Sequence, residues 1–131
     1  MIYRKVTEER TFFIADAAMN DLIRPTLYDA FHEIWPIREA VAATPKTMGD
    51  LVGPVCESGD YLARDHQLPD APAGELLAVL SAGAYGAVQA GTYNSRLLVP
   101  EVMVNGSDFA VVRPRQSYED LIGLDQLASW Q

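Results

Sequence analysis

The sequence predicts a mainly β domain, a barrel or sandwich with a few short helices, that takes up residues 1–131 as a single unit. Short runs of β-branched and aromatic residues recur along the chain, and turn residues separate them about every 8 to 12 residues. The length of 131 residues suits one domain. Folding at that size can bury roughly two thirds of the surface that the unfolded chain exposes. We find no internal repeat, low-complexity tract or linker.

The beginning of the chain predicts a hairpin followed by a short or broken helix. Residues 2–6 and 11–17 are rich in β-branched and aromatic residues, and a polar stretch separates them. The next segment could form a helical turn capped by Asn20 or Asp21. Because Pro25 restricts the residue before it, we expect any helix here to be short or interrupted.

The middle of the chain predicts further strands with turns between them. Residues 35–42 favour a strand, and Pro36 indicates an edge or a strand start. Residues 44–50 are typical of a turn, and residues 68–74, which include two prolines, are typical of a loop. Residues 75–91 have the length of a strand that breaks at its internal glycines, with a helical turn after the break.

The last part of the chain has the clearest local pattern. Residues 101–115 predict a hairpin, because apolar residues flank Asn105 and Gly106, a pair that suits a type I′ turn. Ser117 then begins a segment with two acids in its first turn, which predicts a short capped helix.

Composition and charge exclude several classes of function. Eighteen acidic residues against ten lysines and arginines give a net charge of -8 and a pI near 4.5. Such a chain repels phosphate backbones, so we do not expect it to bind nucleic acid. No apolar run approaches the roughly 20 residues that cross a bilayer, so we expect no membrane association. The charged N-terminus and the single cysteine favour a cytoplasmic protein.

The stretch GPVCESGDYLARD, residues 53–65, contains the only cysteine of the chain, Cys56, directly before Glu57. A thiol is mostly protonated at neutral pH and can therefore donate a proton to a carbanion. The charge of the neighbouring Glu57 favours the protonated form. The alternative is that Cys56 is a small buried hydrophobe. This cysteine with His32 and His66 has no spacing typical of a metal site, and His32 is better explained as structural.

Three further residues have side chains that could bind a carboxylate or a phosphate. Arg24 and Tyr28 are four residues apart and would share a helical face, where both could hold one carboxylate. Tyr85 lies between small residues that allow a ligand to approach, and its hydroxyl can reach a phosphate or a carboxylate. A surface arginine and packed tyrosines are the structural alternatives. The polar residues 94–96 could simply brace a turn.

Four stretches, in this order and spacing, resemble the C-terminal region of the diaminopimelate decarboxylases over about residues 2 to 125: MNDLIRPTLY, GPVCESGDYLARD, AGAYG, and YNSR followed by PEVMVNG. The resemblance implies an enzyme that converts meso-diaminopimelate to L-lysine and carbon dioxide with pyridoxal 5′-phosphate. Members of the family have an N-terminal α/β barrel with the cofactor lysine and a C-terminal β-domain. This chain resembles only the second, and neither Lys5 nor Lys46 matches the cofactor lysine.

The resemblance also implies roles for individual residues. Cys56 matches the proton donor of the family, and Glu57 matches an acid that binds the substrate. Arg24 and Tyr28 match residues that hold the substrate, and Tyr85 matches a residue that contacts both the cofactor phosphate and the substrate. In the family the cysteine and the glutamate reach the active site of the neighbouring subunit, so the resemblance implies a homodimer with shared sites.

One departure and two alternatives accompany the resemblance. Leu97–Val99 replace a proline-containing segment of the family, which leaves the packing of that loop open but alters none of the matched residues. A related decarboxylase of ornithine, arginine or a carboxylated polyamine is one alternative, although those relatives tend to have an aspartate where Glu57 stands. A β-domain without enzymatic activity, acting as an interaction module, is the other.

Overall fold

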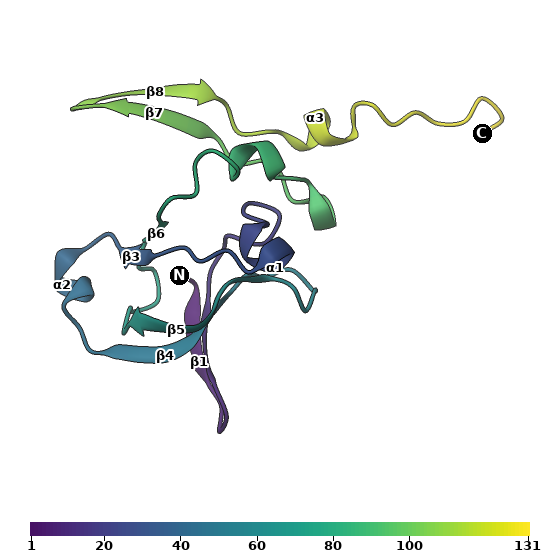
Figure 1. Ribbon diagram of the computed structural model, residues 1–131. Coiled ribbons are helices and arrows are strands. Elements are labelled where there is room, and N and C mark those ends of the chain that lie inside the picture. Colours follow the sequence, from purple (N-terminus) through teal and green to yellow (C-terminus); the bar gives the residue numbers. More distant parts are fainter.

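The computed structural model describes residues 1–131 and confirms a mainly β fold with few short helices (Figure 1). The chain forms a lower part, which contains a four-stranded sheet, and an upper part, where a hairpin and a short helix extend away from that sheet. The elements are β1 (Tyr3–Val6), β2 (Thr11–Ile14), α1 (Arg24–Tyr28), β3 (Ile34–Pro36), α2 (Glu39–Ala42), β4 (Lys46–Val52), β5 (Tyr61–Pro69), β6 (Leu77–Val79), η1 (Ala87–Gln89), η2 (Tyr93–Ser95), β7 (Glu101–Asn105), β8 (Asp108–Arg113) and α3 (Tyr118–Ile122).

The main sheet has the strand order β1-β2-β4-β5. β1 and β2 form the predicted antiparallel hairpin, β2 runs parallel to β4, and β4 pairs with β5 in the antiparallel sense. The pairs β3-β6 and β7-β8 make two separate two-stranded sheets. The strands therefore do not close into a barrel, and only the broader mainly β expectation holds.

One hydrophobic core lies between the main sheet and the segments that cover it. Phe13 on β2 and Leu51 on β4 are its two largest fully buried side chains, and they are paired neighbours in the sheet. Burying a side chain of this size contributes roughly 1.5–3 kcal/mol to folding. The other buried apolar residues of the cluster are Met1, Ala15, Leu22, Ile34, Val41, Leu62, Ala63, Leu68 and Ala71.

Residues 44–50 were expected to form a turn, and this expectation is wrong. The strand β4 begins at Lys46 and pairs with β5 over nearly its whole length. Gly49 is buried within this strand, and a side chain there would collide with the backbone oxygen of Thr11 and the ring of Phe13. The glycine thus marks a close approach between neighbouring strands rather than a turn.

Residues 35–42 form a strand only at their start. β3 ends at Pro36, and α2 begins at Glu39, so the prediction of one strand through this segment is wrong. The alanine-rich sequence after Arg38 favours a helix. Arg38 stands at the boundary, where its guanidinium pairs with the buried carboxylate of Glu75.

The helix α1 is short, as predicted, but Pro25 does not interrupt it. Pro25 lies in the first turn, where a missing backbone N–H costs nothing. No side chain caps this helix. Asp21 instead accepts a hydrogen bond from the backbone N–H of Ala18 at 2.9 Å, which closes a turn before the helix.

The segment 75–91 also differs from its prediction in part. Its strand, β6, is only three residues long, and the chain turns at Ser81, where φ is 55°. The predicted helical turn is present as η1. The loop expected over residues 68–74 starts later than predicted, because β5 continues to Pro69.

The predicted hairpin near the C-terminus is confirmed as β7 and β8. Its turn differs from the expectation, because Asn105 pairs with Asp108 and the two central residues are Gly106 and Ser107. Only Gly106 has a positive φ, 62°, which fits a type II′ turn with glycine first. The predicted capped helix is also confirmed as α3, with a capping box between Ser117 and Asp120. None of the helices is long and apolar enough to span a membrane.

Candidate active-site surface

Cys56 lies in the loop between β4 and β5, and its thiol is exposed. The buried carboxylate of Asp60 supports this loop from within by accepting hydrogen bonds from the backbone N–H of Val55 at 2.6 Å and of Met19 at 2.7 Å. A side chain at Gly53 would occupy the space of this carboxylate. The loop therefore has fixed ends and an exposed tip, and the interpretation of Cys56 as a buried hydrophobe is wrong.

Glu57 follows the thiol, and both of its carboxylate oxygens are in contact with hydrogen-bond donors. The backbone N–H of Gly59 donates to Oε1 at 3.2 Å, and the hydroxyl of Tyr93 donates to Oε2 at 3.3 Å. The side chain is exposed. A carboxylate can accept about four hydrogen bonds, so two positions stay free for a ligand with N–H donors.

Arg24, Tyr28 and Tyr85 lie together at a second position. The Nε of Arg24 donates to the hydroxyl of Tyr28 at 2.6 Å, as their spacing on α1 predicts. The guanidinium carbon lies 5.6 Å from the centre of the Tyr28 ring and 5.8 Å from that of Tyr85. Its Nη1 also donates to the carbonyl of Ser81 at 3.4 Å. One cation thus lies among two exposed phenol rings, an arrangement suited to an anionic group.

The two groups of residues are on neighbouring segments. The hydroxyl of Thr26, on α1, donates to the carbonyl of Gly59, in the cysteine loop. No hydrogen bond joins Cys56 or Glu57 directly to Arg24, Tyr28 or Tyr85. The five residues singled out from the sequence therefore form two groups, which a single helix-to-loop contact connects.

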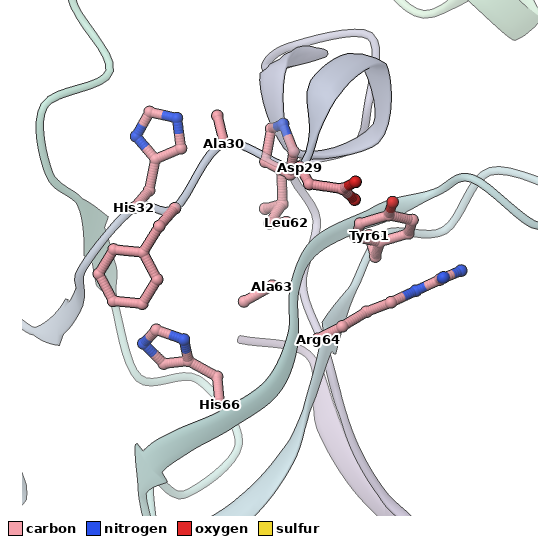
Figure 2. A pocket seen from close by; sticks show the side chains of 10 residues that line it. Asp29, Ala30, His32, Tyr61, Leu62, Ala63, Arg64 and His66 are labelled. Carbon is pink, nitrogen blue, oxygen red and sulfur yellow. The ribbon is translucent and has the colours of Figure 1, made fainter.

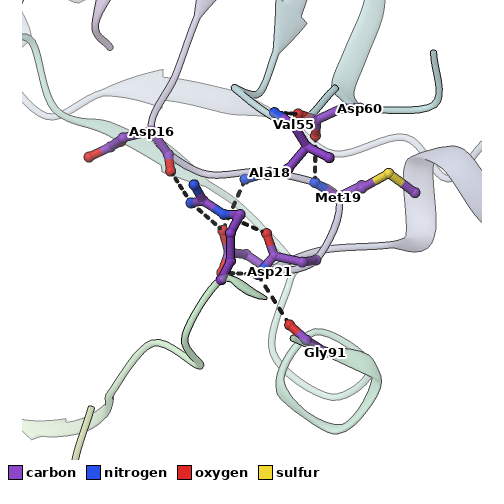
Figure 3. Close-up of polar contacts among 9 residues, drawn as sticks. Asp16, Ala18, Met19, Asp21, Val55, Asp60 and Gly91 are labelled. Carbon is purple, nitrogen blue, oxygen red and sulfur yellow. Dashed lines mark hydrogen bonds and ion pairs between the residues drawn. The ribbon is translucent and has the colours of Figure 1, made fainter. Parts of the chain in front are cut away.

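A polar network links the cysteine loop to the segment after Tyr85, and sequence reasoning missed it (Figure 3). Arg96 donates from Nε to Oδ1 of Asn20 at 2.8 Å and from Nη2 to the carbonyl of Asp16 at 2.5 Å. Its Nη2 also lies 3.6 Å from Asp21. Asn20 is buried, and it exchanges two hydrogen bonds with Gly91. Of the polar residues 94–96, Arg96 is the one whose side chain attaches the turn to residues 16–21.

A pocket of about 170 Å³ under the end of α1 contains none of the five predicted residues. Figure 2 shows its two histidines on one side and Tyr61 and Arg64 on the other. His32 is buried and hydrogen-bonds through Nδ1 to the carbonyl of Leu80 at 2.9 Å, which fits the structural role expected for it. Burial and then the charge of Lys46 hold the pKa of His66 below its usual value, and Glu33 opposes this shift.

The fold and the site together define a β-sheet domain that presents a thiol, a carboxylate, a guanidinium and phenols on neighbouring segments. The chain belongs to the family described as the C-terminal sheet domain of pyridoxal-dependent decarboxylases, whose sequence model matches residues 1–83. The resemblance seen in the sequence motifs is thereby confirmed.

Named relatives and solved structures agree with this assignment. The chain is 52% identical to the diaminopimelate decarboxylase of Zymomonas mobilis over 96% of its own length, and 48% identical to that of Pseudomonas aeruginosa over 95%. The crystal structure of diaminopimelate decarboxylase from M. jannaschii superposes with a TM-score of 0.90 at 32% identity and covers 98% of this chain. That of the Helicobacter pylori enzyme, complexed with L-lysine, gives a TM-score of 0.83 at 39% identity over 94%.

The chain spans about 30% of the length of these proteins. It covers 30% of the Zymomonas mobilis protein, 29% of the Pseudomonas aeruginosa protein and 29% of each of the two crystal structures. The similarity therefore concerns one part of a larger enzyme.

Proposed function

We propose that this chain works as the C-terminal β-domain of a diaminopimelate decarboxylase, which converts meso-2,6-diaminopimelate to L-lysine and carbon dioxide. The observation that supports this most directly is that one domain exposes both the Cys56–Glu57 loop tip and the hydrogen-bonded pair of Arg24 and Tyr28 on α1. The relatives at 52% and 48% identity have that name, and the Helicobacter pylori relative was crystallised with L-lysine.

The substrate has a carboxylate and an ammonium at the end remote from the reacting carbon, and this domain has a group for each. Arg24, beside the hydroxyl of Tyr28, is suited to hold the distal carboxylate, because a planar guanidinium can donate two parallel hydrogen bonds to it. Glu57 is suited to the distal ammonium, because its carboxylate has free acceptor positions. In the proposed dimer, an Arg24 and a Glu57 from different subunits would thus select a substrate by both of its distal charges.

We assign the delivery of the proton to Cys56. Its thiol is exposed at the loop tip, where it can reach a substrate carbon. Donation from one fixed direction determines which face of the α carbon receives the proton and therefore the configuration of the product. Asp60 serves this step indirectly, because it anchors the loop beneath the thiol.

In this chain, Tyr85 is the residue that we assign to pyridoxal 5′-phosphate. Tyr85 is exposed beside the guanidinium of Arg24, so its hydroxyl is suited to the phosphate of the cofactor. When bound, the cofactor accepts the electron pair left by the departing carboxylate. Lys5 and Lys46 lie on strands of the main sheet and contact none of these residues, so we assign the cofactor lysine to a barrel domain outside this chain.

We also propose that the working enzyme is a cytoplasmic homodimer. Cys56 and Glu57 stand at an exposed loop tip, which suits side chains that reach across an interface into the site of a second subunit. An exposed free thiol is compatible with the reducing cytoplasm. Light scattering on the full-length enzyme would measure the dimer.

A fusion protein tests the proposed function. Residues 1–131 would replace the matching C-terminal part of the Zymomonas mobilis enzyme, and L-lysine formation from meso-diaminopimelate would be measured. We expect activity, which Cys56→Ala removes and Ser58→Ala, a change in the same loop, leaves intact. Ornithine and arginine as substrates test the related decarboxylases.

Two results would contradict the proposal. A folded fusion that prefers ornithine or arginine would assign the domain to another branch of the decarboxylases, and a folded fusion without any decarboxylation would point to an interaction module.

The chain alone, supplied with cofactor and diaminopimelate, should release no carbon dioxide. Turnover by the chain alone would contradict the need for a second domain.

A further inference from the structure

We infer that Tyr93 is a positioning residue that holds the carboxylate of Glu57 in place for the distal ammonium of the substrate. This inference rests on the proposed function. Tyr93 was not among the residues singled out from the sequence, and it lies in η2, outside the cysteine loop and outside α1. Its hydroxyl donates to Oε2 of Glu57 at 3.3 Å.

The two donors to Glu57 fix its carboxylate from two directions. The Gly59 N–H comes from the same loop, whereas the Tyr93 hydroxyl comes from a segment far away in the sequence. An exposed glutamate without such contacts changes rotamers freely, and a ligand that binds it has to order it first. A carboxylate already held in one orientation binds an ammonium more tightly, because less freedom is lost.

Tyr93 is itself anchored on both sides in the sequence. Before it, the backbone N–H of Gly91 donates to the carbonyl of Asn20 at 2.9 Å, and the side chain of Asn20 donates back to Gly91 at 3.2 Å. After it, Arg96 donates to Asn20 and Asp16 (Figure 3). The turn between these anchors includes Asn94, whose positive φ of 56° is a conformation that asparagine tolerates well.

The cysteine loop is attached to the same segment that anchors Tyr93. Asp60 accepts hydrogen bonds from Met19 in that segment and from Val55 in the loop. Residues 16–21 thus connect to both partners of the Tyr93–Glu57 hydrogen bond. The geometry of that bond is therefore set by a network that includes the buried side chains of Asn20 and Asp60.

The kinetic test uses Tyr93→Phe in the active fusion enzyme, with Tyr118→Phe as the control for loss of an exposed phenol hydroxyl. We expect Tyr93→Phe to raise KM for meso-diaminopimelate about tenfold, since a hydrogen bond to a charged group is lost, while kcat stays within about twofold. Inhibition by L-lysine, which keeps the ammonium, should weaken in parallel. Inhibition by 2-aminopimelate, which lacks it, should not change.

A double-mutant cycle separates positioning from a general structural role. In the background of Glu57→Gln, adding Tyr93→Phe should have no further effect on KM, because the group that it positions is already altered. An equal loss of affinity for meso-diaminopimelate and 2-aminopimelate would overturn the inference, as would unchanged kinetics of Tyr93→Phe.

A spectroscopic measurement tests the inference without an activity assay. In protein labelled with ¹³C at glutamate side chains, Tyr93→Phe should move the Cδ resonance of Glu57, and Tyr118→Phe should not. An unmoved resonance contradicts the inference even if diaminopimelate is the substrate. A wild-type fusion without activity on diaminopimelate would instead contradict the proposed function alone.

Discussion

Residues 1–80 contain the whole hydrophobic core, whereas residues 87–131 contain no buried residue. Of the 22 buried residues, all but Gly86 lie between Met1 and Glu75. The difference is clearest for two phenylalanines on strands, because Phe13 on β2 is 1% exposed and Phe109 on β8 is 73% exposed. The family match, residues 1–83, nearly coincides with the first region.

The comparison shows that different interactions hold the two regions in their folded form. The first region has a shared core, whereas β7 and β8 form a separate hairpin. Its large apolar side chains are at least half exposed, among them Val102, Met103, Val104, Val111 and Val112. A two-stranded hairpin by itself is only marginally stable in water. We therefore expect the same kind of substitution to have different effects in the two regions.

The largest expected effect comes from truncating the two phenylalanines. Phe13→Ala should lower the free energy of unfolding by about 3–5 kcal/mol, since it leaves a cavity beside Leu51. Phe109→Ala should change it by no more than about 0.5 kcal/mol. Urea denaturation of the two variants measures both values. Equal losses would contradict the division of the chain into these two regions.

The second expected effect concerns the hydrogen bonds that the buried carboxylate of Asp60 accepts in the first region. Asp60→Asn keeps the shape of the side chain but leaves one of the backbone N–H groups of Val55 and Met19 without an acceptor. We expect a loss of about 1–3 kcal/mol in the free energy of unfolding.

Asp70→Asn is the matched control for this effect. Asp70 pairs with Arg4 at the surface, and an exposed ion pair is worth at most about 1 kcal/mol. Urea denaturation again measures the difference between the two variants. If both substitutions cost the same, the network around Asp60 would not stabilise the loop.

Local sequence patterns predicted those elements whose main contacts are between residues close together in the sequence. The hairpins β1-β2 and β7-β8 and the cap at Ser117 are of this kind. The predicted type of the turn between β7 and β8 was still wrong. The strands pair one residue later than expected, so Gly106 is the first of the two central turn residues and not the second. Gly49 was misinterpreted because the ring that requires it lies on another strand.

The same distinction applies to the site. The contact between Arg24 and Tyr28 follows from their spacing on one helix, so the sequence was enough to predict it. Tyr93 and Asp60 were missed because their partners come from distant segments. Both residues stand inside quoted motifs, Asp60 in GPVCESGDYLARD and Tyr93 in YNSR, but nothing in those motifs indicates their partners.

The third expected effect is local to the second region. Ser117 accepts a hydrogen bond from the backbone N–H of Asp120 at 3.1 Å, and Asp120 accepts one from the backbone N–H of Ser117 at 2.8 Å. Hydrogen bonding to the Asp120 carboxylate, first by the backbone N–H of Ser117 and then by the Ser117 side chain, holds the pKa of Asp120 below its usual value. Ser117→Ala should destabilise α3 by about 1 kcal/mol.

The measurement for this prediction has a local and a global part. The Cα chemical shifts of residues 118–122 should move toward random-coil values, while the urea midpoint of the whole chain stays the same. A lowered midpoint would show that α3 unfolds together with the core, which would weaken the comparison.

The smallest expected effect is a pH dependence located in the first region. The pKa of His66 lies below its usual value of about 6.5, first because of burial and then because of the charge of Lys46, while Glu33 opposes the shift. Below pH of about 6.5 the unfolded chain therefore binds more protons at this site than the folded chain, so stability falls as the pH falls through that value.

Replacing the histidine tests this dependence directly. His66→Gln should flatten the decrease in stability between about pH 7.5 and 5.5, since the group that takes up the proton is gone. NMR titration of the His66 ring should give a midpoint below about 6.5, and Lys46→Gln should move that midpoint upward, because a repelling charge is removed. The effect is small, since the ring is only half-buried and water screens part of the repulsion. An unchanged slope in His66→Gln would assign the acid sensitivity to other groups of the core.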